Sequence, residues 1–242
     1  MNIVKVDATT STNALAKVLN KDKTEHAFCV SAEFQTEGRG QLNSQWQSSR
    51  SENLMFTVVF NDLDLEIENQ FVLNAMVCLR ILRVLKSNNI PNIRFKWPND
   101  IFLQDKKICG ILTSNLTYHK YHLIGIGIDS DFEEIPPDLA DIMSSLKAYI
   151  GEEIENVLIL QRFLDEFSAV LPAFIDSGLS FFHAEYLDNS YLLGKTVTIG
   201  SEFEEYTGKV MRINKKGAII IRLVNGMLQP FYSGTINKIY QD

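Results

Sequence analysis

The apolar positions of this chain follow two periodicities, which together predict a mixed α/β fold. Steps of three and four residues predict two long amphipathic helices, at Gln70–Ser87 and Asn156–Ile175. Short runs rich in β-branched and aromatic residues predict strands that the helices cover. These runs are Met1–Asp7, Phe28–Phe34, Leu54–Phe60, Ile93–Lys96, Ile101–Leu103, Lys107–Leu116 and Leu123–Ile128.

The pattern changes near Tyr191, where short strands separated by glycine and asparagine replace the long elements. The Asn225-Gly226 pair between two of these runs is typical of a tight hairpin. We therefore predict two domains, residues 1–188 and 189–242, the second a small β-barrel. Its predicted strands are Lys195–Ile199, Tyr206–Ile213, Ala218–Val224 and Met227–Tyr232.

The composition narrows the function classes. The formal net charge of −7 argues against a nucleic-acid partner, whose binding depends on neutralising phosphates. No apolar stretch reaches 18 residues, and the first residues lack the features of a signal peptide, so we expect no membrane span. The three cysteines are far apart and odd in number, which favours buried free thiols in the cytoplasm.

Two polar segments carry candidate chemistry in the first part of the chain. Ser11, Thr12 and Asn13 precede an apolar run and are typical of a helix N-terminus. The segment Thr36–Trp46 predicts a long loop, in which glycines on both sides of Arg39 allow a close approach to a ligand. Arg39 can bind a carboxylate or phosphate with two parallel hydrogen bonds, although an ordinary surface loop has the same composition.

The string Lys96–Asp100, which reads Lys-Trp-Pro-Asn-Asp, follows a predicted strand. Pro98 ends regular pairing, so we expect Lys96 at a rigid strand end. A lysine held there is a preorganised cation for an anionic transition state, unless its stem simply packs on Trp97 at the surface.

Glycines alternate along the predicted strand that ends in Asp129. Gly125 and Gly127 leave one face of this strand without side chains, so a ligand or another backbone segment can approach. A dinucleotide-binding fingerprint is not present, because no helix follows and the full glycine motif is missing.

Taken together, these strings resemble the biotin protein ligases. The shared features are Ser11–Asn13, Gln35 at a strand end, Gly38–Gly40 with Trp46 six residues later, Lys96–Asp100, Lys107 before Gly110–Leu112, Gly125–Ile128 and Ser145-Leu146. The resemblance runs from about Val6 to the C-terminus. It implies an α/β (α+β) catalytic domain with a mixed sheet, followed by an SH3-like β-barrel.

The resemblance also implies roles for individual residues. Lys96 and Arg39 would be catalytic, in contact with the carboxylate and phosphate oxygens. The nucleotide would meet Arg39, Trp46, Asn99, Lys107 and Asp129. Biotin would meet Ser11, Thr12, Asn13, Gln35, Gly38, Arg39, Gly40, Gln41, Lys96, Gly110, Ile111, Leu112, Gly125 and Gly127.

Three positions depart from the family pattern. Gln41 and Asn43 stand where an arginine and a glycine are common, so fewer charges neutralise the phosphates. Asp129 stands where the glycine strand usually ends in asparagine. A carboxylate beside a triphosphate requires a cation between them, and we therefore expect Asp129 on the metal side of a magnesium site.

The activity implied by the resemblance has two steps. Biotin and ATP give biotinyl-5′-AMP and pyrophosphate, and a lysine of a biotin carboxyl carrier domain then receives biotin. Mg²⁺ would assist the reaction with ATP. A homodimer is possible, but the sequence does not determine the oligomeric state. The chain reaches Ser11 too early for an N-terminal DNA-binding domain, so we expect no repressor function.

The alternatives are a lipoate or octanoate ligase and a non-catalytic biotin or nucleotide sensor. We also expect the Thr36–Trp46 loop to be disordered without ligand.

Overall fold

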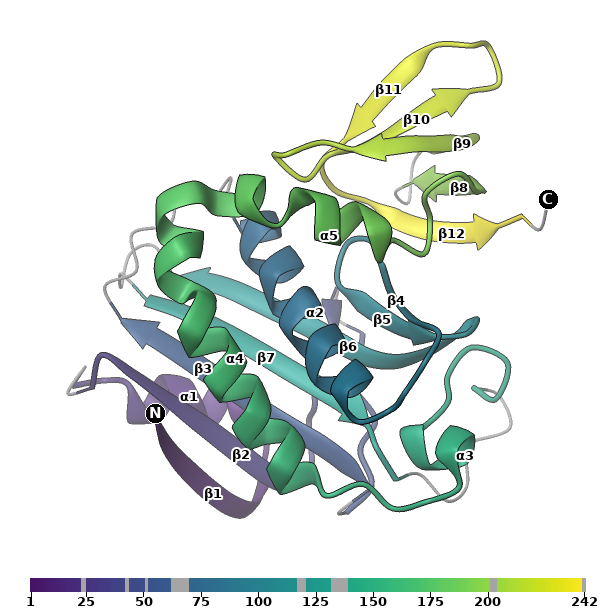
Figure 1. The fold of residues 1–242 in the computed structure, drawn as a ribbon. Helices are drawn as coiled ribbons and strands as arrows, with labels where there is room; N and C mark the ends of the chain where they lie inside the picture. The colour runs from purple at the N-terminus through teal and green to yellow at the C-terminus, as the bar shows by residue number, and fades with distance from the viewer. Residues whose placement is uncertain are drawn as a thin grey trace.

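The computed structural model describes residues 1–22, 25–41, 44–50, 52–61, 70–116, 121–131, 139–200 and 204–240. Its main element is a seven-stranded sheet in the order β1-β2-β3-β7-β6-β5-β4 (Figure 1). The β1 and β2 strands are parallel and all other neighbours are antiparallel, so the sheet is mixed, as predicted. The strands are β1 (Asn2–Thr9), β2 (Ala27–Gln35), β3 (Asn53–Asn61), β4 (Ile93–Lys96), β5 (Asp100–Leu103), β6 (Lys106–Leu116) and β7 (Tyr121–Asp129).

Helices cover both faces of this sheet, which explains why the central strands are buried along their whole length. The long helices α2 (Gln70–Ser87) and α4 (Asn156–Ser177) lie on one face, and α1 (Thr12–Leu19) lies on the other (Figure 1). The structure also contains α3 (Leu146–Ile150), a 3₁₀ turn (Gly178–Phe181) and α5 (His183–Asp188).

Side-chain alternation along β3 assigns residues to these two faces. The ring of Phe56 lies 5.4 Å from that of Phe163 in α4, so the even-numbered residues face the long helices. Val59 packs in a separate cluster with Ala16 of α1. The odd-numbered residues Met55 and Thr57 therefore share the α1 face with Val59.

A second, five-stranded antiparallel sheet forms the C-terminal part of the chain, in the order β11-β10-β9-β8-β12. Its strands are β8 (Thr196–Gly200), β9 (Glu205–Ile213), β10 (Ile219–Leu223), β11 (Leu228–Phe231) and β12 (Thr235–Ile239). The expected small β domain is confirmed. The division between residues 188 and 189 stays a prediction.

One backbone turn joins the two sheets. The indole Nε1 of Trp97 donates a hydrogen bond of 3.0 Å to the carbonyl oxygen of Gly217, in the turn before β10. Gly217 has φ +87°, and a Cβ atom there would lie 1.7 Å from Cδ1 of Phe71. Only glycine allows the turn to pack this closely against α2.

Among the described residues, no helix combines the length and the apolar character needed to cross a bilayer.

Candidate functional site

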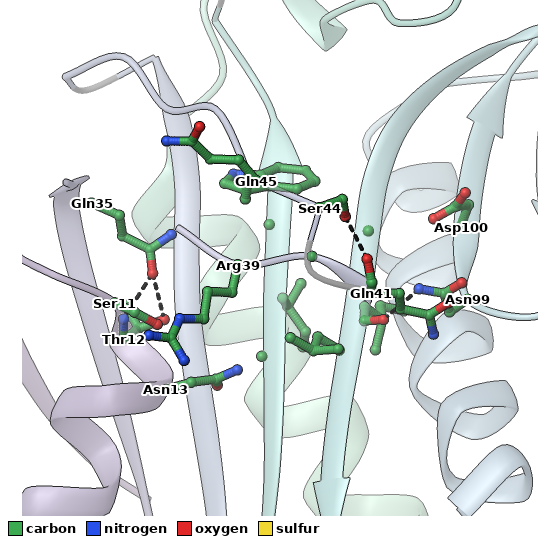
Figure 2. A pocket seen from close by; sticks show the side chains of 18 of the residues that line it. Ser11, Thr12, Asn13, Gln35, Arg39, Gln41, Ser44, Gln45, Asn99 and Asp100 are labelled. Carbon is green, nitrogen blue, oxygen red and sulfur yellow. Dashed lines mark hydrogen bonds between the residues drawn. The ribbon is translucent and has the colours of Figure 1, made fainter. Parts of the chain in front are cut away.

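A cavity of about 380 Å³ opens on the α1 face of the large sheet (Figure 2). Seven separate segments of the chain contribute to its wall, which is why no single motif defines it. The lining residues are Ser11, Thr12, Asn13, Gln35, Arg39, Gly40, Gln41, Ser44, Gln45, Trp46, Asn99, Asp100, Lys107, Gly110, Ile111, Leu112, Gly125, Ile126, Gly127 and Thr235.

One end of the cavity is built from neutral hydrogen-bonding groups. Oε1 of Gln35 accepts bonds from the backbone N–H of Thr12, at 2.7 Å, and from the Thr12 hydroxyl, at 3.1 Å. Because a backbone N–H can only donate, the oxygen of the Gln35 amide must face α1. Its Nε2 donates one proton to Sδ of Met55 at 3.2 Å, and its second proton can be donated to a ligand.

The start of α1 completes this polar end. Ser11 is the N-cap residue of the helix, but its hydroxyl makes no capping bond and so is not committed to the helix. The amide of Asn13 lies flat on β7, since a Cβ atom at Gly125 would be 2.7 Å from both Nδ2 and Oδ1 of Asn13. Gly125 is therefore required for Asn13 to reach the cavity wall.

Glycines form the floor of the cavity, and the indole of Trp46 covers part of it. A Cβ atom at Gly127 would lie 2.5 Å from Cε2 and Cζ2 of Trp46, and one at Gly110 would lie 3.0 Å from Cζ3. Real Cβ atoms do not approach a ring as closely as 2.5 Å, so the contact with Trp46 requires glycine at position 127, and at position 110 a side chain would be tightly crowded. The Nε1 donor of Trp46 is buried without a partner among the described residues.

The described part of the 36–46 loop forms a narrow hairpin. Gly40 N donates to Ser44 O at 2.7 Å, and Trp46 N donates to Gly38 O at 2.9 Å. Figure 2 shows the Arg39 side chain pointing toward Thr12 and Asn13, away from Asp100. Asn43 lies outside the described residues, and the disorder expected for the ligand-free loop stays a prediction.

Lys107 reaches the opposite end of the cavity because of a β-bulge between β5 and β6. The register shifts between Ile101 and Phe102, so that the neighbouring residues Ile108 and Cys109 both pack in the core on the α2 side. The extra residue re-aims Lys107 onto the face of Gly110. Its Nζ lies 2.8 Å from Oδ1 of Asp100 and 5.8 Å from the centroid of the Trp46 ring.

Lys96 is the last residue of its strand, as expected, but it is not part of the cavity wall. It lies on the edge strand β4, and β5 separates it from β6, so it does not line the cavity. Its Nζ lies 5.0 Å from the centroid of the Phe102 ring. Burial lowers the pKa of Lys96, and Asp100 partly opposes that effect. Lys96 is thus half-buried beside the cavity, whereas Lys107 is in its wall.

Asp129 lies on the same face of β7 as the floor glycines, but it is only 2 % exposed and does not line the cavity. Its Oδ1 accepts a bond of 2.9 Å from Nδ2 of Asn53. Burial raises the pKa of Asp129 to about 8, although Lys107 and Asn53 act in the opposite direction. This covered carboxyl group does not fit the role of metal ligand that the sequence suggested.

Comparison with models of known protein families identifies the family of this chain. The biotin/lipoate A/B protein ligase family matches residues 4–131, which is more than half of the 242 residues. The chain belongs to this family. The match covers every segment of the cavity wall except β12.

Individual relatives from this ligase family are similar in sequence or structure to this chain over most of its length. The bifunctional ligase/repressor BirA of Bacillus subtilis is 26% identical, over 95% of this chain and 72% of that protein. BirA of Escherichia coli is 26% identical, over 86% and 65%. The structure of biotin protein ligase from Aquifex aeolicus in complex with biotin and ATP superposes with a TM-score of 0.86, at 26% identity and 96% coverage of both chains.

The cavity of this family member contains most of the residues that the sequence selected. The exceptions are Gly38, Lys96 and Asp129, which do not line it. Sequence reasoning missed five lining residues: Ser44, Gln45, Asp100, Ile126 and Thr235. Asp100 was part of a quoted motif, and its neighbour Asn99 was selected. Thr235 had no signal, because β12 was not predicted.

Mg²⁺ is expected for an ATP-dependent member of this ligase family. Among the described residues, no group of three or more His, Cys, Asp or Glu side chains could hold a metal. Asp100 is the one carboxylate in the described cavity wall. Mg²⁺ typically keeps several waters and binds one or two carboxylates together with substrate phosphates. The residues therefore fit a metal that arrives on the nucleotide.

The buried acid gives a pH-dependent prediction for stability. The pKa of Asp129 in the folded protein, about 8, lies above the ordinary value of 3.8, so the folded protein holds a proton that the unfolded chain releases. Stability from this group is fully present below about pH 4 and is lost as the pH rises toward 8. Asp129→Asn should therefore stabilise the fold increasingly with pH, by roughly 3 kcal/mol more at pH 8 than at pH 5.

Urea unfolding of wild type and Asp129→Asn at both pH values measures this difference. A constant difference in unfolding free energy between pH 5 and pH 8 would contradict a raised pKa for this carboxyl group.

Proposed function

We propose that this chain is a biotin–protein ligase, which activates biotin with ATP and transfers it to a lysine of a biotin carboxyl carrier domain. One observation carries the proposal: a single cavity joins a neutral polar end, a glycine floor and a lysine at the opposite end. This order matches a ligand with a neutral cyclic urea, an apolar chain and a reacting carboxylate.

The polar end supports a urea-bearing substrate. Gln35 presents its amide nitrogen as a donor, because its oxygen is bonded to Thr12. The Ser11 hydroxyl makes no capping bond and can donate or accept. A neutral urea needs both donors and acceptors, and it gains nothing from charge. Octanoate lacks the urea and would leave these buried groups without partners, at a cost in affinity.

The first chemical step needs positive charge where two anions meet. The biotin carboxylate oxygen forms a bond to the α-phosphorus of ATP, and the bond from that phosphorus to the pyrophosphate oxygen breaks. Lys107 is placed to neutralise the charge that develops there, and Asp100 fixes its ammonium group at 2.8 Å. Asp100 is the cavity carboxylate that would hold Mg²⁺, which would supply further neutralisation of the phosphates when bound with the nucleotide.

Arg39 would act as a mobile second cation. It points toward the polar end in Figure 2, and the glycines beside it allow the backbone rotation that would bring its guanidinium to the phosphates. In the second step the carrier lysine attacks the acyl carbon of the anhydride, the bond to AMP breaks, and the amine loses its proton. No protein nucleophile is required.

Pyrophosphate release tests the proposal directly. We expect release from ATP and Mg²⁺ that depends on biotin, followed by transfer of labelled biotin to a carrier domain. Release that depends on octanoate instead would identify a lipoate-type ligase. Binding of biotin without turnover would identify a sensor and overturn the ligase proposal.

The proposed location of the enzyme is the cytoplasm. Cys29, Cys78 and Cys109 are buried free thiols, which fit the reducing cytoplasm. Two expectations stay predictions: that the chain binds no nucleic acid, and that it can form a homodimer.

A further inference from the structure

A buried hydroxyl lies directly behind the polar end of the cavity and belongs to none of the sequence motifs. Thr57 is in the middle of β3, is 0% exposed and does not line the cavity. It lies opposite Gly125 of β7, on the face that α1 covers. A polar side chain in this position must be satisfied by its neighbours.

Two ligand-facing residues share this hydroxyl group. Oγ1 of Thr57 lies 2.8 Å from Oγ1 of Thr12 and 2.7 Å from Oδ1 of Asn13. Amide oxygens only accept hydrogen bonds, so Thr57 must donate when it bonds Asn13. The hydroxyl of Thr57 has a single proton, so at any one time it donates either to Oδ1 of Asn13 or to Oγ1 of Thr12, whose own proton is directed toward Gln35.

The direction of these bonds determines what a ligand meets. With Oδ1 of Asn13 turned toward Thr57, the amide nitrogen of Asn13 is left on the cavity side (Figure 2). When the Thr57 proton goes to Thr12 instead, it leaves the Thr12 proton directed to Gln35, whose amide is already oriented by the backbone N–H of Thr12. Thr57 therefore acts most directly on the Asn13 amide and secondarily on the Thr12 hydroxyl.

We propose that Thr57 is a positioning residue for substrate recognition, which orients the Asn13 amide so that its nitrogen faces the ureido carbonyl of the substrate and which supports the Thr12 hydroxyl beside it. This inference rests on the proposed function and names the part of that substrate whose recognition depends on Thr57. Thr57 itself stays behind the residues that touch the ligand.

The test is Thr57→Val, which keeps the side-chain shape and the strand propensity but removes the proton. We expect the KM for biotin to rise about 10- to 100-fold, because the Asn13 amide loses the donor that orients it and the Thr12 hydroxyl loses its buried partner. The kcat at saturating biotin and the KM for ATP should stay within about twofold, since Lys107 and the nucleotide end are unaffected. Thr57→Ser restores the hydroxyl and should return the KM for biotin close to wild type.

Two further measurements separate the explanations. Thr57→Cys has a weak donor of similar size and gives a second test if Thr57→Val does not fold. A folded Thr57→Val or Thr57→Cys enzyme with an unchanged KM for biotin overturns the role of Thr57 and leaves the ligase proposal standing. A uniform loss of kcat with no change in KM also overturns it. A wild type without biotin-dependent pyrophosphate release overturns both proposals.

Discussion

Replacing Lys107 with methionine is expected to lower the rate of biotin-dependent pyrophosphate release by about 100- to 1,000-fold, the usual cost of removing one charge-stabilising donor. Methionine keeps much of the length and packing of lysine but carries no charge. Because the ammonium of Lys107 lies in the cavity wall beside Asp100, its loss removes the fixed cation at the reacting end. Initial rates at saturating biotin and ATP measure the effect.

Lys96→Met is the matched control, because it removes the other lysine near Asp100. We expect less than about a tenfold loss, since Lys96 is separated from the glycine floor by β5. A larger loss from Lys96→Met than from Lys107→Met would reverse this assignment and return the catalytic role to the lysine that the sequence selected.

Gly127→Val should abolish substrate binding while leaving the fold intact. The new Cβ atom would lie 2.5 Å from the Trp46 indole, so the ring must move into the space of the ligand. Valine favours strands, so β7 itself should tolerate the change. We expect the dissociation constant for biotin to rise about 100-fold or more, as measured by calorimetry, with a thermal midpoint close to that of wild type.

Gly151→Asn provides the corresponding control. Gly151 ends α3 with φ +77°, and a Cβ atom there meets nothing within 4 Å. Asparagine tolerates this left-handed conformation better than other residues, so binding should match wild type. A biotin affinity for Gly127→Val within threefold of wild type would show that the floor has room for a side chain.

The main elements of the fold could be predicted because their apolar patterns are long and regular. The helix at Gln70–Ser87 has the predicted bounds, and the second long helix begins at Asn156 as predicted and ends at Ser177, shortly after the predicted Ile175. The β12 strand escaped prediction because it alternates a single buried residue, Ile236, with exposed ones. A strand this short is held mainly by its pairing with β8, and the local sequence of β12 carries no information about that pairing.

The chemistry of the site was predictable by residue type but not by geometry. The motif around Lys96 drew attention to that lysine, yet the strand order and the bulge decide which lysine faces the cavity. The bulge requires knowledge of the β5–β6 register, which a single sequence does not give. Thr57 lacked any signal, because a threonine in a buried strand looks like an ordinary β-former.

The bond from Trp97 to Gly217 means that the turn before β10 in the C-terminal domain anchors the segment that leads to Asn99 and Asp100. Asn99 and Asp100 follow Trp97 within three residues and line the cavity, and Thr235 of β12 lines it as well. A chain cut after residue 193 would leave the indole of Trp97 exposed and the segment before Asp100 without its anchor. Shortening the protein to its larger lobe would therefore yield an impaired enzyme instead of a minimal one.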